Sequence, residues 1–192
     1  ITLIAQQSVG PTLGQDSINS SLKAAMYGLL LVALFMILFY RFAGLIAVVT
    51  LGLYVAISLA IFKLLPVTLT LSGIAGFILS VGMAVDANVL IFERLKEELA
   101  LGKTLRNALE ESFVRAWPSI RDGNLTTLIS CAALYWFTSS VIKGFALTLA
   151  IGVMLSMFSA VVATRTVFRF LSAYGVIQNT PWLFPGRKPP KE

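Results

Sequence analysis

The sequence predicts an all-α polytopic membrane protein with five transmembrane helices and a cytoplasmic interfacial helix. Of its 192 residues, 57% are hydrophobic and only 12% are charged, whereas soluble domains carry about 25% charged residues. Five stretches of 17 to 22 residues contain no charged side chain, and about 20 helical residues are enough to cross the hydrocarbon layer of a bilayer. The composition therefore excludes an ordinary soluble domain.

The predicted spans follow these charge-free stretches and together form a transmembrane domain over residues 22–170. They lie, in chain order, at about 23–41, 43–63, 66–92, 123–142 and 144–165. Between the third and fourth spans, apolar residues recur at helical spacing opposite charged ones. This pattern predicts an interfacial helix over about 104–117, which we expect to end at Pro118 because proline disrupts helix interiors.

The two ends of the sequence differ in character from the spans. The first residue is Ile and the opening ITLIAQQSV is rich in residues typical of strands, so residues 1–21 are interpreted as the end of a truncated exported domain and its connector. Residues 171–192 combine four prolines with basic residues and lack apolar periodicity, which predicts a disordered cytoplasmic tail.

The distribution of basic residues predicts the orientation in the membrane. Twelve of the fifteen Lys and Arg residues fall in one set of loops and three in the other, and cytoplasmic loops carry the excess of positive charge. We therefore expect the N-terminal end of this sequence outside and the C-terminus in the cytoplasm. A net charge of +6 is too modest to indicate nucleic-acid binding.

Asp86 is an acidic residue inside a predicted span, in the run GMAVDANVLIF. A charged side chain at mid-membrane costs roughly 2.5–3.5 kcal/mol on insertion scales, so such residues usually face a protein interior or a water-filled path. Burial disfavours the charged carboxylate, which predicts a group able to take up and release protons near neutral pH. Helical spacing aligns Asp86 with Gly82 and Glu93 on one face. An inert hydrogen-bonded role for Asp86 is the alternative.

Other polar and small residues are candidates for a supporting role. The polar cluster at the start of the fourth span lies at a depth similar to that of Asp86, so the two could meet, although helix capping is an equally good explanation for Asp122 and Asn124. Asn88 lies on a different side of the same helix from Asp86, so we expect it to bond a different neighbouring segment. The supporting polar candidates are Asn88, Asp122, Asn124, Thr126 and Thr127, and the helix-packing candidates are Gly73, Gly76 and Gly82.

The residue inventory argues against an enzyme and against a bound cofactor. An aspartyl intramembrane protease needs two carboxylates facing each other within spans, and only Asp86 is clearly embedded. No GxxxxGK[ST] loop for nucleotide binding is present. There is no histidine, and the single cysteine, Cys131, cannot form a thiolate cluster. We expect no metal, and an energy source other than ATP.

Four motifs in this order identify a resemblance to the SecD branch of the SecD/SecF protein-export family, within the RND superfamily. They are VGPTLG at 9–14, TLTLSGIAGF at 68–77, GMAVDANVLIFERLKEEL at 82–99 and IKGFALTLAIGVMLSMFSAVVATR at 142–165. The resemblance covers roughly residues 8–170. It implies five helices of an RND/SecDF-like six-helix half, preceded in the family by one helix and an exported substrate-binding domain.

The resemblance also implies a function. It indicates a subunit of the bacterial Sec machinery that uses the proton motive force to assist late export of polypeptides across the cytoplasmic (inner) membrane. In the family the acidic residue of the DAN motif, matched by Asp86, is tied to proton movement. The implied partners are SecF, SecYEG, SecA and YidC, together with exported unfolded polypeptides and the lipid bilayer.

The sequence departs from the family pattern at three places, which puts local loop geometry and the Asp122–Asn124 region in doubt. Ser72 stands where the family commonly has proline, Gly123 interrupts a usual D-A/S-N pattern, and WFTSSVIKG lacks glycines often found before its lysine. Two alternatives stay open, namely a structural subunit of translocon assembly that conducts no protons and an RND-type exporter of small molecules or lipids.

Overall fold

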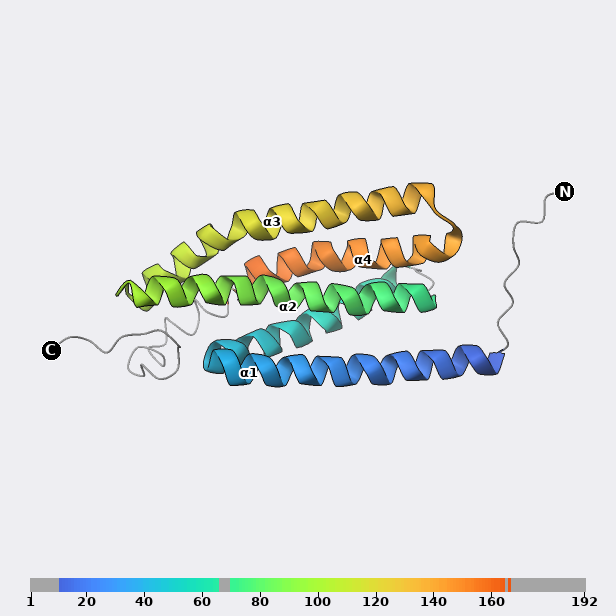
Figure 1. The fold of residues 1–192 in the computed structure, drawn as a ribbon, viewed down its shortest axis with the longest axis horizontal. Helices are drawn as coiled ribbons and strands as arrows, with labels where there is room; N and C mark the ends of the chain where they lie inside the picture. The colour runs from blue at the N-terminus through green and yellow to red at the C-terminus, as the bar shows by residue number, and fades with distance from the viewer. Residues whose placement is uncertain (1–10, 66–69, 165, 167–192) are drawn as a thin grey trace.

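A computed structural model describes residues 11–65, 70–164 and 166 of the chain, and that part is helical apart from short connections. Four α-helices and a short π-helix follow one another, and successive segments run in opposite directions along a common axis (Figure 1). Three of the helices in the described part are long and apolar enough to cross a membrane: Gly14–Leu64, Leu71–Ala100 and Ser140–Phe158.

Helix α1 (Pro11–Leu64) consists of two helices joined at a sharp reversal. Arg41 has φ 50° and ψ −117°, which lies outside helical geometry, and α1 doubles back at this point (Figure 1). A Cβ atom on Gly44 would collide with the backbone carbonyl of Met36, so the turn needs glycine there. The reversal falls at the charged residue that separates the first two predicted spans.

The N-terminal boundary of the domain differs from the prediction. Residues 11–21, assigned above to a connector, form the first turns of α1, in which Pro11 occupies a favourable first position and Gly14, a weak helix former, does not interrupt the helix. Residues 1–10 of the predicted connector and the predicted tail 171–192 lie outside the described residues.

Helix α2 (Leu71–Ala100) is the central element and packs against α1, α3 and α4. The Thr70 side chain caps its start by accepting a hydrogen bond from the backbone N–H of Gly73 at 3.1 Å. The helix continues eight residues past the predicted span end at 92, because Leu95 and Leu99 are buried against α3. A turn with Gly102 at φ 84° then leads to the next helix.

Helix α3 (Leu105–Phe137) contains Pro118 in its interior, so the predicted helix end at Pro118 is wrong. The helix continues because buried residues on both sides of the proline, Ala116 and Ile120, belong to one core cluster shared with α2, and one missing N–H does not outweigh that packing. The segment predicted as an interfacial helix is therefore the first half of α3, with its apolar face against α2.

Helix α4 (Ser140–Phe158) runs beside α2 and α3 and continues into the π-helix η1 (Ser159–Thr164). The sequence predicts a boundary between the last two spans at residue 143. In the structure the connection between α3 and α4 lies at Thr138 and Ser139, whose backbones are extended. These two residues end one helix and begin the next, whereas Lys143 lies in the first turn of α4 with its ammonium 5.7 Å from the centroid of the Tyr135 ring.

Candidate functional site: the Asp86 cleft

Asp86 lies midway along α2 and lines a cleft of about 380 Å³ between α2 and α3. Its side chain is exposed to this space rather than packed in the core. Within the described part of the chain, its carboxylate has no hydrogen bond and no ion pair. The described structure therefore leaves the acid predicted to handle protons open and without a neutralising partner.

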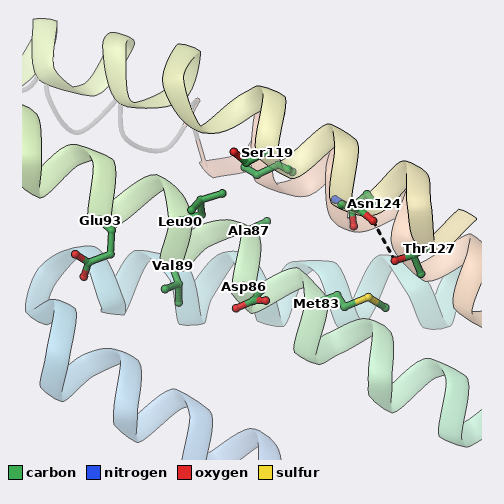
Figure 2. A pocket seen from close by; sticks show the side chains of 11 residues that line it. Met83, Asp86, Ala87, Val89, Leu90, Glu93, Ser119, Asn124 and Thr127 are labelled. Atoms are coloured by element: carbon green, nitrogen blue, oxygen red, sulfur yellow. Dashed lines mark hydrogen bonds between the residues drawn. The ribbon is translucent and has the colours of Figure 1, made fainter.

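The opposite wall of the cleft comes from α3 and is polar. Ser119, Gly123, Asn124 and Thr127 line it, and Figure 2 shows Asn124 and Thr127 on α3 across from Asp86 on α2. Asn124 is only 9% exposed, and no partner is found for its amide among the residues that the structure describes. A buried amide without a partner costs free energy, so this cleft has unused capacity for a hydrogen bond.

The sequence-predicted residues divide into those that reach the cleft and those that do not. Asn124 and Thr127 line it with Asp86, as helical rise suggested. Asp122 is exposed and accepts a hydrogen bond from Arg121 at 2.8 Å, while Thr126 is exposed and donates to the Asp122 carbonyl. Asn88 is buried on another face of α2. Asp86 and Asp122 thus do not form a facing pair.

Two lining residues with polar side chains, Glu93 and Ser119, were not assigned to the site from the sequence. Glu93 lies at one end of the cleft, and its alignment with Asp86 at a spacing of seven residues is the signal that could have identified it. Ser119 follows Pro118 on α3; its position depends on α3 continuing through the proline, which sequence patterning did not predict. Among the described residues, no group of three or more His, Cys, Asp or Glu side chains could hold a metal ion.

The glycines of α2 set how closely its neighbours approach. A Cβ on Gly76 would lie 2.6 Å from Thr148 Oγ1 and 2.7 Å from the Phe145 carbonyl, so α2 and α4 nearly touch there. Gly73 has the same neighbour, because the Thr148 hydroxyl donates to its carbonyl at 2.9 Å. A Cβ on Gly82 would meet nothing within 4 Å, so no described part of this chain packs closely against it, and its packing role stays a prediction.

Buried hydroxyl groups hold α2 to α4 and to the second half of α1. The Tyr54 hydroxyl from α1 lies 2.8 Å from Ser80 Oγ on α2 and donates to the Gly152 carbonyl on α4 at 3.2 Å. The Ser72 hydroxyl donates to the Val141 carbonyl at 2.5 Å. Ser72 is the residue at which the sequence departs from the proline that the family resemblance led us to expect. These bonds fix the N-terminal half of α2, which leads into the Asp86 cleft.

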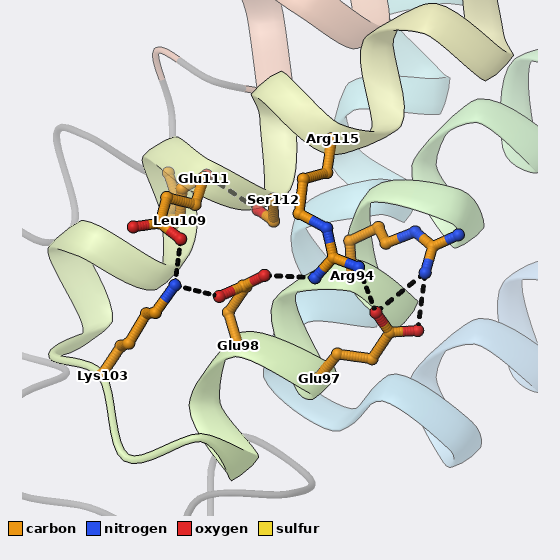
Figure 3. Close-up of polar contacts among 8 residues, drawn as sticks. All are labelled: Arg94, Glu97, Glu98, Lys103, Leu109, Glu111, Ser112 and Arg115. Carbon is orange, nitrogen blue, oxygen red and sulfur yellow. Dashed lines mark hydrogen bonds and ion pairs between the residues drawn. The ribbon is translucent and has the colours of Figure 1, made fainter.

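At its other end α2 is joined to α3 by an ion-pair network around Glu98 (Figure 3). Glu98 is 1% exposed, and its carboxylate accepts hydrogen bonds from Lys103 Nζ at 2.6 Å and from Arg115 Nη1. Lys103 also pairs with Glu111, and Arg115 Nη2 lies 3.3 Å from Glu97 Oε2. The hydrogen bonds from Lys103 and Arg115 lower the pKa of Glu98 to about 2.

Comparison with known proteins agrees with this geometry. Residues 1–173 match the family described as protein export membrane protein SecD/SecF, C-terminal. The chain is 59% identical over 173 residues to a protein translocase subunit SecD from Thermobaculum terrenum, covering 88% of this chain and 34% of the relative. It is 57% identical over 186 residues to the SecD of Synechocystis, covering 96% of this chain and 39% of the relative.

A solved structure extends the comparison to the fold. The crystal structure of SecDF from Thermus thermophilus, described as a translocon-associated membrane protein, superimposes with a TM-score of 0.86 at 43% identity. The match covers 92% of this chain and 25% of that one, so the chain spans well under half the length of the proteins it resembles. Sequence motifs, family match and fold agree, and the chain belongs to the SecD/SecF family of protein export membrane proteins.

Proposed function

We propose that this chain is the membrane domain of a SecD subunit of the bacterial Sec machinery, which uses the proton motive force to assist the late export of polypeptides. Asp86 is the group that takes up and releases protons. The observation that carries the proposal is the open position of Asp86 in a cleft on an apolar helix long enough to cross a membrane, without a partner in the described part of the chain. The SecD names of the relatives support the role in protein export.

The physical basis is the coupling of charge to a transmembrane potential. Moving one charge through the potential supplies about 2.3 kcal/mol per 100 mV. That energy is enough to bias a helix bundle whose two arrangements differ by a few kcal/mol. Asp86 alternates between the charged and the neutral form as water reaches it from one side and then from the other.

The proposed topology has five passes, formed by the two halves of α1, by α2, by the second half of α3 and by α4. The reversal at Arg41 and the turn around Gly102 lie at the cytoplasmic end, since twelve of the fifteen basic residues belong to loops on that side. Helix α2 has 30 residues and is about 45 Å long, whereas the hydrocarbon layer is about 30 Å thick. Its charged end and the start of α3 project as a hairpin into the cytoplasm.

Partners complete the proposed machine. A SecF half supplies a basic counter-ion for Asp86, because no Lys or Arg lies deep in the predicted spans of this chain. SecYEG and SecA provide the channel and the ATP-driven stage, YidC joins the assembly, and unfolded polypeptides are the cargo. No cofactor beyond the proton gradient is required.

The test is Asp86→Asn in the full-length protein, with Asp122→Asn as a matched control. Asparagine keeps the shape and hydrogen bonding of the side chain but abolishes titration. In inverted membrane vesicles, we expect Asp86→Asn to reduce the gradient-dependent part of export at least tenfold, with normal assembly, while Asp122→Asn behaves as wild type. Export by Asp86→Asn that still responds fully to the gradient, in a normally assembled complex, would refute proton coupling and leave a structural subunit of translocon assembly.

A second readout of the same preparation separates protein export from transport of other cargo. Co-purification with SecF, SecYEG or YidC is expected. Co-purification with an outer-membrane conduit instead would favour an RND-type exporter of small molecules or lipids.

A further inference from the structure

Glu93 shares the cleft with Asp86, although it lies near the predicted cytoplasmic end. The two carboxylates are seven residues apart on α2, which corresponds to about 10 Å along the axis and nearly the same face of the helix. Both line the same space of about 380 Å³, together with the hydroxyl-bearing residues Ser119 and Thr127. A path for a proton between the two acids would therefore run along the polar groups of the α3 wall, opposite an α2 wall that also carries apolar side chains such as Met83 and Leu90.

The surroundings of Glu93 differ from those of Asp86. The Tyr40 hydroxyl at the end of the first half of α1 donates a hydrogen bond to Glu93 Oε1 at 3.0 Å. Lys96 Nζ lies 3.7 Å from Oε2, and the Glu93 side chain is 43% exposed. On α3, the charged Arg121 and Asp122 that flank the cleft residues pair with each other and are exposed. Glu93 therefore contacts the cleft, the solvent and α1 at once.

Tyr40 immediately precedes the sharp reversal of α1. The next residue, Arg41, adopts φ 50°, a strained conformation for a non-glycine residue that persists only where surrounding contacts hold it. The Tyr40 ring is 5% exposed and lies 5.5 Å from the ring of Phe92, the residue before Glu93. Tyr40 thus attaches the strained turn of α1 directly to the Glu93 segment of α2.

The first half of α1 packs less closely on α2 away from this turn. An apolar groove of about 220 Å³ runs between them, lined on one side by residues such as Ala25 and Gly28 and on the other by Val81, Gly82 and Val85. Of the large residues in this half of the helix, Met36 and Tyr40, both near the turn, are the ones that the described structure buries, while Leu38 and Phe39 beside them face outward. The helix is therefore anchored near Arg41 and has space beside it further from the turn.

We propose that Glu93 is the cytoplasmic-side proton acceptor of the Asp86 cleft, and that the Tyr40 hydrogen bond transmits its charge state to the first half of α1. This inference rests on the proposed function. The O–H bond of protonated Asp86 breaks, leaving a carboxylate, and water in the cleft carries the proton to Glu93, where a new O–H bond forms. Glu93 then gives the proton to cytoplasmic water and returns to the carboxylate.

The consequence for α1 follows from the strength of the hydrogen bond. A hydroxyl bound to a carboxylate makes a bond roughly twice as strong as one between neutral groups. Protonation of Glu93 therefore weakens the attachment of Tyr40 and releases the turn at Arg41. The first half of α1 then shifts relative to α2 across the apolar groove.

The first experiment compares Glu93→Gln, Glu93→Asp and Asp86→Asn in the full-length protein, with Glu97→Gln as a matched control. Glu97 is on the same helix and is exposed outside the cleft. In inverted vesicles we expect Glu93→Gln to lower gradient-dependent export at least fivefold, Glu93→Asp to restore most of it with a shifted pH profile, and Glu97→Gln to match wild type. Thermal midpoints and co-purification with SecF measure folding and assembly.

The outcomes separate the two proposals. Normal export by Glu93→Gln together with loss by Asp86→Asn overturns the role of Glu93 and leaves the proposed function standing. Normal export by both variants overturns the proposed function as well. Equal losses in Glu93→Gln and Glu93→Asp, with lowered thermal midpoints, identify a structural role and also overturn the inference.

A second experiment tests the link through Tyr40. An oxidant-driven disulfide cross-link between Ala25→Cys and Val81→Cys, on opposite walls of the groove, reports the position of α1 at a series of pH values. Because thiol ionisation by itself makes the yield depend on pH, each yield is divided by that of the same cysteine pair carrying Tyr40→Phe or Glu93→Gln. We expect these ratios to change at least twofold with pH, and ratios that stay constant across the series would overturn transmission through this hydrogen bond.

Discussion

Asp86 and Glu98 are acidic residues on the same helix, twelve positions apart, and their surroundings are opposite. Glu98 is 1% exposed and accepts hydrogen bonds from two cations, Lys103 and Arg115. Asp86 is open to a cleft, and the described part of the chain offers its carboxylate no hydrogen bond or ion pair. Carboxylates of the same chemistry therefore serve different purposes within one element.

The difference shows what partners do to a buried acid. Two cations compensate for the lost hydration of Glu98 and hold it in the charged form, so it joins α2 to α3 and cannot readily change protonation. Asp86 has no such cationic partner in the described part of the chain. In the middle of α2 the face that carries Asp86 is thus open, although Ala84 and Ala87 beside it are buried, while the C-terminal end of the helix is fixed by ion pairs and its N-terminal half by close contact with α4.

Removing the Glu98 carboxylate should have the largest effect on stability. Glu98→Ala leaves Lys103 and Arg115 without their shared acceptor, and we expect a loss of about 3 kcal/mol in the free energy of unfolding. Glu97→Ala, at an exposed ion pair next to it, should cost about 1 kcal/mol or less. Asp86→Asn should change stability little. Thermal unfolding of the full-length protein in detergent measures the stability of all three variants. Equal losses for Glu97→Ala and Glu98→Ala would contradict the greater contribution of the buried Glu98.

Acid should weaken the same network without a substitution. The pKa of Glu98 is lowered from 4.5 to about 2, first by the hydrogen bond from Lys103 and then by that from Arg115. A lowered pKa in the folded state means that the stabilisation is complete above the unfolded value and is lost as pH falls through the folded one. The temperature of the unfolding midpoint should therefore decrease as the pH is lowered from about 4.5 to about 2. Glu98→Ala should lack this component, and an identical acid profile in that variant would assign the loss to other groups.

Several of these features could be predicted from the sequence, because they depend on patterns along one segment. The helical membrane character follows from charge-free runs, the reversal of α1 falls at the charged Arg41, and Asp86 is recognisable as an acid inside an apolar run. The meeting of Asp86 with Asn124 and Thr127 followed from helical rise. Each of these inferences needs only local spacing and the thickness of a bilayer.

The features that could not be predicted depend on contacts between segments. Nothing in ERLKEEL distinguishes the buried Glu98 from the exposed Glu97, because the difference comes from Lys103 and Arg115 on the other side of a turn. Pro118 lies inside α3 because the core on both sides of it is shared with α2. The hydrogen bond from Tyr40 to Glu93 joins residues 53 positions apart, and no local pattern reveals it.

Smaller effects than that of Glu98→Ala are expected at the glycines, and they test whether the N-terminal half of α2 is fixed while the face that carries Asp86 is open. Gly76→Ala places a methyl group 2.7 Å from the Phe145 carbonyl, a backbone atom that moves only with α4, and overpacking of this kind costs about 1–3 kcal/mol. Gly82→Ala enters open space, so the better helix propensity of alanine should leave stability unchanged or raise it by about 0.5 kcal/mol. Thermal midpoints of the two variants form the comparison. A loss at Gly82 equal to that at Gly76 would mean that another helix packs against the face of α2 beside Asp86 in the assembled protein, and that the open middle of α2 is closed by a partner.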